Sequence, residues 1–230
     1  LRKQPKHALE KVNLIFGKMQ LQLLVELPQK LPKNIGIPVK QLLTKEYKLP
    51  TIQLWTALFF AFGCLYFLIS WIPKLASNAG LSMELAIYAG TVFNIGAFVG
   101  VLTQGYISSR IGLKKTIALF LVLTALLMVV FQVFIGTDVL LFIFGLLGFG
   151  IQGGFVGLYA VAARMYPTEF RTTGVGWAIG AGRLGGVLGP ALGGILVGMG
   201  LSMATNFMIF AIPALLAGVV TYFISSKEIS

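Results

Sequence analysis

Long apolar runs follow one another along the chain from about residue 50 onward. Each run has about 20 residues or more, and only short polar or glycine-containing stretches separate them. A helix of about 20 apolar residues crosses the roughly 30 Å hydrocarbon core of a bilayer. The hydrophobic pattern therefore predicts an all-α membrane protein with six transmembrane helices, at about 54–73, 84–107, 116–135, 139–163, 172–197 and 203–225.

The first fifty residues have a different pattern and form a separate region. Apolar side chains recur there at three- and four-residue spacing, which places them on one face of a helix: Leu9, Val12, Phe16, Met19 and Leu23. This pattern predicts a short amphipathic helix lying on the membrane surface. Prolines from Pro28 onward break regular structure and indicate a linker. We therefore expect a loop region with the helix and linker at 1–50 and a six-helix transmembrane bundle at 51–230.

Composition supports the membrane assignment, and charge placement predicts the orientation. Hydrophobic residues make up 57% of the chain and charged residues 11%, against about 25% charged in soluble domains. Bases are concentrated in 1–50 and in alternate loops, as at Arg110 and Lys114, whereas the opposite loops contain Lys74 and Asp138. Loops rich in Lys and Arg stay in the cytoplasm, so both ends of this chain are expected there. Because the bases are spread over membrane-flanking loops, the net charge of +11 does not indicate nucleic-acid binding.

Arg183 lies near the middle of the fifth apolar run. It follows Arg171 by twelve residues, about 18 Å of helix, which puts it near the centre of the bilayer. An arginine there costs about 2.5–3.5 kcal/mol and is normally paired inside a bundle or a cavity. No Asp or Glu of this sequence lies at that depth. The counter-charge is therefore a bound carboxylate, an acidic residue from outside this sequence, or both in turn, and a fixed structural ion pair is the alternative.

Aromatic and amide side chains in the apolar runs are candidates to complete a site around this arginine. A small-molecule site is mostly apolar with a few polar groups. The residues selected with Arg183 for substrate binding or coupling are Trp177, Gln152, Asn94, Tyr159 and Phe155, and further candidates are Trp55, Phe59, Phe62, Tyr66 and Gln104. For each aromatic the alternative is ordinary core or lipid-facing packing, and for each amide it is an interhelical hydrogen bond.

Enzyme chemistry has little support in the sequence. There is no Ser/His/Asp set, no cluster of metal ligands and no Walker-type phosphate loop. The single histidine, His7, has no candidate metal-binding neighbour. We therefore expect neither an enzyme nor a metal site.

Two segments resemble motifs of a transporter family. Gly105–Lys115 reads GYISSRIGLKK and resembles the loop motif of the major facilitator superfamily, although Ser109 stands where that motif usually has an acid. Tyr166–Pro190 reads YPTEFRTTGVGWAIGAGRLGGVLGP and closely resembles the loop and eleventh span of its aromatic acid:proton symporter family. The resemblance implies the C-terminal half of a twelve-helix fold, built as two inverted three-helix repeats, with a missing N-terminal six-helix half as its partner.

The same resemblance implies a function. It is the proton-coupled uptake of a small aromatic carboxylate such as benzoate or hydroxybenzoate, by alternating access, across the bacterial inner membrane. The proton gradient is the driving force and no cofactor is expected. Because no titratable acid or histidine lies mid-span, the proton site is expected in the missing half. The first alternative is a sugar or other organic-anion porter of the same superfamily, and the second alternative is a channel.

The loop motifs also imply residues for conformational gating. These are Gly105, Arg110, Gly112, Lys114, Arg164, Pro167, Glu169 and Arg171. Arg164, Glu169 and Arg171 are expected to form a charge cluster at the cytoplasmic ends of neighbouring helices, with simple membrane anchoring as the alternative. Nine glycines between 174 and 194 give the fifth helix a small surface. That surface suits either a sliding interface with the missing half or permanent packing.

Overall fold

The computed structural model describes residues 7–20, 22, 24–27, 39–137 and 139–225. The chain divides into two compact units, Leu1–Ile37 and Pro38–Ser230. The first unit contains helix α1 (Ala8–Lys18), in the region where the apolar spacing predicts a helix. The Asn13 amide donates to the Leu24 carbonyl and accepts from the Leu24 N–H, both at 2.9 Å. Leu23 and positions 28–38 of the predicted linker lie outside the described residues.

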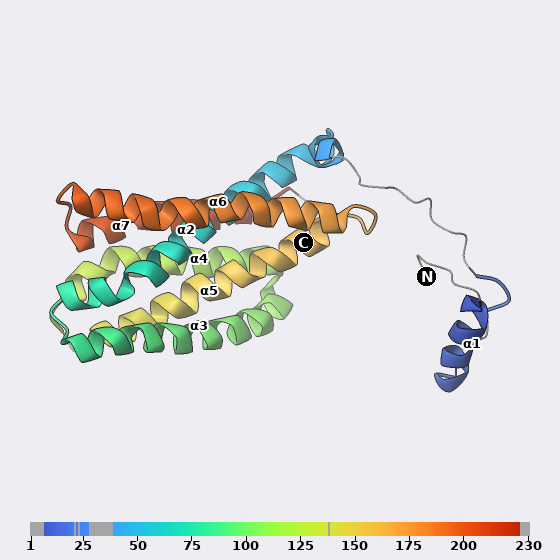
Figure 1. Ribbon diagram of the computed structural model, residues 1–230, viewed down its shortest axis with the longest axis horizontal. Coiled ribbons are helices and arrows are strands. Elements are labelled where there is room, and N and C mark those ends of the chain that lie inside the picture. Colours follow the sequence, from blue (N-terminus) through green and yellow to red (C-terminus); the bar gives the residue numbers. More distant parts are fainter. Residues whose placement is uncertain (1–6, 21, 23, 28–38, 138, 226–230) are drawn as a thin grey trace. The chain divides into compact units, whose positions relative to one another are not determined.

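Six long helices make up the second unit, and the predicted all-α six-helix fold is confirmed. All six are long and apolar enough to cross a membrane, and the described residues contain no strand. They pack lengthwise against one another (Figure 1). The elements are a short 3₁₀ turn Val39–Leu43, then α2 (Lys48–Asn78), α3 (Met83–Ile111), α4 (Leu113–Val130, extended by a 3₁₀ turn Phe131–Phe134), α5 (Leu140–Met165), α6 (Arg171–Gly198) and α7 (Met203–Tyr222).

Local sequence signals set several helix boundaries. Ser82 caps α3 by accepting from the Leu85 N–H at 3.3 Å, and Ser202 caps α7 by accepting from the Thr205 N–H at 3.1 Å. These bonds satisfy backbone donors that have no partner in the first turn of a helix. Gly112 alone separates α3 from α4, and its φ of 95° favours glycine over other residues.

The six helices are related by an internal repeat. The most extensive helix contacts are α2 with α6 and α3 with α5. If α2, α3 and α4 are matched in order with α5, α6 and α7, the α2–α6 pair corresponds to the α5–α3 pair. Because consecutive spans run in opposite directions, a repeat of three helices starts from opposite sides of the membrane each time. The arrangement is therefore two inverted three-helix repeats.

Glycines allow these two main pairs to approach at backbone level. A Cβ at Gly185 or Gly189 of α6 would overlap a carbonyl oxygen of α2, and a Cβ at Gly96 or Gly148 would do the same between α3 and α5. Small residues permit such close packing of helices in lipid. By contrast, a Cβ at Gly176 or Gly180 would meet nothing within 4 Å.

The glycine face of α6 thus has two parts. Added Cβ atoms at Gly182 and Gly193 would overlap Phe62 and Phe67, as those at Gly185 and Gly189 would overlap the α2 backbone. For these positions the structure favours permanent packing within this chain over a sliding interface. The part around Gly176 and Gly180 remains open, as does Gly198 at the end of α6.

Candidate functional site

Arg183 projects from the middle of α6 and is exposed in this chain. Its Nη1 donates to the Tyr66 hydroxyl at 3.4 Å, and its guanidinium carbon lies 5.7 Å from the centre of the Phe62 ring. Within the described ranges, the only ion pair closer than 4.0 Å joins His7 to Glu10. The guanidinium is therefore held by an aromatic ring and a phenol, and no carboxylate of the described chain neutralises it.

The rings beside Arg183 belong to one aromatic cluster from α2 and α5. Phe62 stacks on Tyr66, with ring centres 5.9 Å apart, and meets Phe155 edge to face at 4.7 Å. Tyr159 packs edge to face on Phe155 at 5.3 Å. Three helices thus combine a permanent positive charge with ring faces and two phenol hydroxyls. We call this group, Arg183 with Phe62, Tyr66, Phe155 and Tyr159, the arginine–aromatic cluster.

Gln152 lies on the same side of α5 as this cluster. It precedes Phe155 by three residues and Tyr159 by seven, a spacing that keeps all three on one helix face. Its side-chain Oε1 is buried and has no hydrogen-bond partner in the structure. Leaving a buried acceptor unpaired costs about 1–3 kcal/mol. This oxygen is therefore an unpaired hydrogen-bond acceptor on the cluster side of α5.

Trp177 occupies a different place, one to two turns before Arg183 on α6. It stacks on Trp55 of α2, with ring centres 6.1 Å apart and planes at 21°. The pair borders a hollow of about 730 Å³ whose remaining lining residues are Thr172, Thr173, Gly176, Gly180, Ala181 and Leu184. The two threonines were missed by the sequence reasoning, because nothing in the spacing distinguishes them from other residues near a helix start. Arg183 does not line this hollow.

The side-chain amide of Asn94 is hydrogen-bonded within its own helix. Its Nδ2 donates to the Gly90 carbonyl at 2.8 Å, one turn earlier on α3. The side chain is exposed in this chain. The structure therefore gives it a local bond within its helix and does not bring it into the arginine–aromatic cluster.

The residues of the α3–α4 loop motif make local contacts. Arg110 donates to the Tyr106 hydroxyl at 3.0 Å and lies over its ring, and a Cβ at Gly105 would meet open space. Lys114 donates to the Ile224 carbonyl at 3.0 Å, just beyond the end of α7. A cation at a helix C-terminus is favoured by the helix dipole. Lys114 thus links the start of α4 to the end of α7.

The α5–α6 connection does not contain the expected charge cluster. Arg164 and Glu169 are exposed, and the described residues show no ion pair joining them to each other or to Arg171. Arg171 instead donates from Nε to the Tyr166 carbonyl at 3.1 Å, and the Pro167 carbonyl accepts from the Phe170 N–H. A gating role for these residues stays a prediction.

Tyr166 anchors this connection to the start of α2. Its side chain is fully buried, and its hydroxyl donates to the Thr51 Oγ1 at 3.1 Å. Burial raises the pKa of the Tyr166 phenol, so the group stays neutral and able to donate. The buried ring also packs on Gly174 at the start of α6. The α5–α6 loop is thus fixed from two sides.

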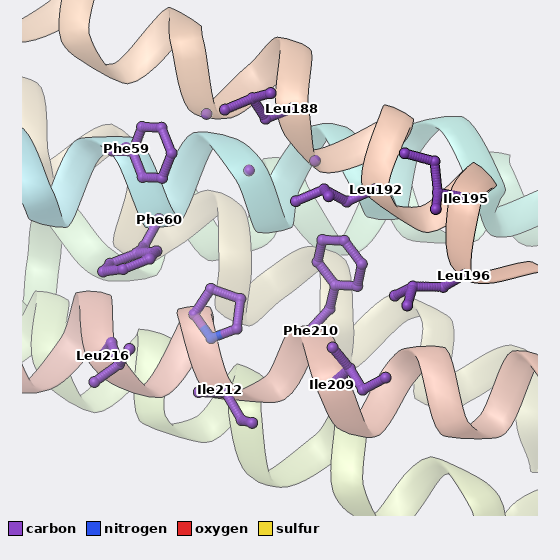
Figure 2. Close-up of a pocket in the computed structure, with 14 residues that line it drawn as sticks. Phe59, Phe60, Leu188, Leu192, Ile195, Leu196, Ile209, Phe210, Ile212 and Leu216 are labelled. Atoms are coloured by element: carbon purple, nitrogen blue, oxygen red, sulfur yellow. The ribbon is translucent and has the colours of Figure 1, made fainter. Parts of the chain in front are cut away.

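A second cavity, between α2, α6 and α7, is wholly apolar. Its volume is about 430 Å³, and all fourteen residues that line it are hydrocarbon or glycine. Figure 2 shows Leu188 and Leu192 of α6 on one side and Ile212 and Leu216 of α7 on the other. A site that orients a ligand needs some precisely placed polar groups. This cavity therefore does not suit a small anion, and the arginine–aromatic cluster remains the candidate.

Comparison with known proteins identifies the family. Residues 29–229 match the sequence profile of the Major Facilitator Superfamily. The chain belongs to this superfamily. Its fold agrees with that of the Escherichia coli fucose:proton symporter FucP, with a TM-score of 0.70 over 93% of this chain and 52% of the other. The sequences are 16% identical, so that match establishes the fold alone.

Among its relatives are transporters named for aromatic acids. The chain is 34% identical to the gallate transporter of Pseudomonas putida, 30% identical to the benzoate transport protein of Acinetobacter baylyi and 34% identical to the 4-hydroxybenzoate transporter PcaK of Pseudomonas aeruginosa. These matches cover 74–81% of this chain and 38–40% of the relatives. The expected resemblance to aromatic acid transporters is confirmed, and the relatives are transport proteins rather than enzymes.

Proposed function

We propose that this superfamily chain forms one half of a secondary active transporter for a small aromatic carboxylate such as benzoate or hydroxybenzoate. The observation that carries the proposal is the arginine–aromatic cluster, in which Arg183 has ring contacts but no acidic partner. A guanidinium binds a carboxylate through two parallel hydrogen bonds. The neighbouring rings offer faces and edges for an aromatic body. The names of the relatives point to the same class of substrate.

The role of each residue follows from its position. Arg183 would bind the carboxylate, while Phe155 and Tyr159 would contact the substrate ring. Gln152 would accept a hydrogen bond through its unpaired Oε1 when the substrate carries a hydroxyl group. Trp177 would contact the substrate from the α6 hollow, which it lines together with Trp55. Asn94 is the weakest member of the set, because its amide is already bonded within α3.

Proton coupling is proposed to depend on a six-helix half outside this chain. The sequence holds no Asp, Glu or His in the middle of a span, and transporters usually couple to protons through such a group. The chain also covers only 38–40% of the aromatic acid transporters it matches. The missing half would approach α3 and α6, the two least buried of the six spanning helices. Alternating access would then move one half against the other.

Gating is proposed at the cytoplasmic ends of the helices. The α3–α4 motif of Gly105, Arg110, Gly112 and Lys114 and the α5–α6 segment of Arg164, Pro167, Glu169 and Arg171 lie on the side where Lys and Arg are concentrated. By the positive-inside rule, that side faces the cytoplasm of a cell whose inner membrane holds the protein. The contacts that these side chains make would differ between the inward-open and outward-open states.

Uptake by the complete transporter tests this function. We expect saturable, proton-gradient-dependent uptake of labelled benzoate by cells or proteoliposomes containing the wild-type protein. Arg183→Ala should abolish uptake and Arg183→Lys should reduce it strongly, since lysine lacks the two-pronged geometry. Lys74→Ala, at the far end of α2, is the matched control and should transport normally.

The same assay separates the alternatives. A sugar porter would take up labelled fucose and not labelled benzoate, and a channel would show benzoate flux without coupling to the proton gradient. Undiminished transport by both Arg183 variants would contradict the assignment of this residue.

A further inference from the structure

Helix α1 presents one face on which two aliphatic side chains lie between two lysines. Lys11, Leu14, Ile15 and Lys18 follow the spacing i, i+3, i+4 and i+7, which places them in one stripe along the helix. We call these four residues the lysine stripe. Leu14 is 63% exposed and Ile15 is 53% exposed, and both lysines are exposed. No ion pair involves either lysine within the part of the chain that the structure describes.

The opposite face of α1 is partly covered. On this face Leu9, Val12 and Phe16 are only partly exposed. On this same face, Asn13 holds the backbone of Leu24 through its two hydrogen bonds. Three residues of the apolar face that the spacing indicates, Leu9, Val12 and Phe16, are therefore partly covered, whereas Met19 of that face is 62% exposed. The face left free is the lysine stripe.

We propose that the lysine stripe binds the surface of an anionic lipid bilayer. Leu14 and Ile15 would enter the boundary between headgroups and acyl chains. Lys11 and Lys18 would bind lipid phosphates while their aliphatic stems lie along the same apolar surface. The partly covered apolar residues on the other face would stay packed within the first unit. The ligand is an anionic phospholipid headgroup region.

Charge and tethering favour a membrane over a protein partner. Residues 1–50 contain ten Lys or Arg and three Glu, a net charge of +7, and basic segments beside a membrane are attracted to anionic lipid. About 20 residues separate Leu27 from Lys48, where the first spanning helix begins, and they extend over no more than about 70 Å. This tether keeps α1 close to the bilayer and raises its effective concentration there. The stripe also lacks the Trp, Tyr or Arg anchors that dominate protein interfaces.

A fluorescent reporter on the full chain in lipid nanodiscs tests the proposal. Cys64 is the only cysteine and is buried, so Cys64→Ala gives a background for single labels. An environment-sensitive dye would be attached at Ile15→Cys or, as a second site on the stripe, Leu14→Cys. Gly17→Cys is the matched control for the Ile15→Cys label, because it is exposed, has open space around it and lies about 160° round the helix from Ile15, whereas it lies only about 60° from Leu14.

We expect the stripe labels to shift to shorter emission wavelengths and to be quenched by brominated lipid when the nanodiscs contain phosphatidylglycerol. The Gly17→Cys label should not change. Replacing Lys11 and Lys18 with Gln should weaken the association about fivefold per lysine. Equal signals from both faces, or stripe signals that do not depend on phosphatidylglycerol, would overturn the proposal. No substrate enters the assay, so its result is independent of the transport proposal.

Discussion

At the scale of single residues, the central feature is a guanidinium that has no acidic partner among the described residues. Arg183 rests against the Phe62 ring and donates a long hydrogen bond to Tyr66. Contact with a ring face stabilises a cation by about 0.5–2 kcal/mol, depending on its desolvation. These contacts fix the orientation of the side chain and leave its other N–H groups available. Under the proposed function, an anion would therefore bind Arg183 without first breaking an ion pair among the described residues.

Tyr66→Phe tests how the orientation of Arg183 contributes. The change removes the hydrogen-bond acceptor for Nη1 and keeps the ring that stacks on Phe62. A single hydrogen bond contributes about 0.5–1.5 kcal/mol. We therefore expect the KM for benzoate uptake to rise about 2- to 10-fold with little change in the maximal rate. Tyr222→Phe, at the end of α7, should leave both values unchanged.

The sequence predicts that Arg183 lacks an acidic partner within this chain, which agrees with the described residues, but it could not identify all of the neighbours of Arg183. Periodicity shows that Gln152, Phe155 and Tyr159 share a face of α5, and the structure places Phe155 and Tyr159 in one aromatic cluster. The sequence could not show that the Asn94 amide donates a hydrogen bond to a carbonyl one turn earlier on its own helix. Nor could it show that Arg171 bonds to a backbone carbonyl in place of Glu169. Such choices depend on side-chain conformations, which the spacing of residues does not encode.

At the scale of helices, glycine placement decides which faces pack within this chain. Hydropathy predicts each span but not its exact ends, since α2 begins at Lys48 and includes polar residues such as Gln53, and α7 ends at Tyr222, before the predicted end at 225. A helix can continue beyond the bilayer in polar residues, where an apolar run gives no signal. The glycine content of α6 likewise predicts a small surface without indicating its partner. The structure assigns most of that surface to α2.

A pair of glycine substitutions on α6 tests this division. Gly185→Ala would place a methyl group against the Phe59 carbonyl, whereas Gly180→Ala would place it in open space. Overpacking costs about 1–3 kcal/mol, and alanine otherwise favours a helix over glycine by about 1 kcal/mol. We expect Gly185→Ala to lower the thermal unfolding midpoint in detergent and Gly180→Ala to leave it unchanged or raise it. Equal midpoints for the two variants would contradict the close α2–α6 packing.

At the scale of the whole molecule, charge asymmetry predicts how the bundle sits in the membrane. The helix ends near Arg110 and Arg171 should face the cytoplasm, and the α2–α3 connection near Ser77 should face outward. Cysteine labelling in intact cells measures this directly, after Cys64→Ala removes the native thiol. Ser77→Cys should react with a membrane-impermeant thiol reagent, and Ser109→Cys should react only after the membrane is permeabilised. The reverse pattern would invert the proposed topology.

The most direct test of the account compares a charged ligand with its neutral analogue on the complete transporter. Charge-assisted hydrogen bonds contribute about 1.5–3 kcal/mol, so wild-type protein should bind benzoate roughly 10- to 150-fold more tightly than benzamide. Arg183→Ala should lose this preference, while the Lys74→Ala control should keep it. If Arg183→Ala still prefers benzoate to benzamide by the wild-type ratio, Arg183 does not bind the substrate carboxylate.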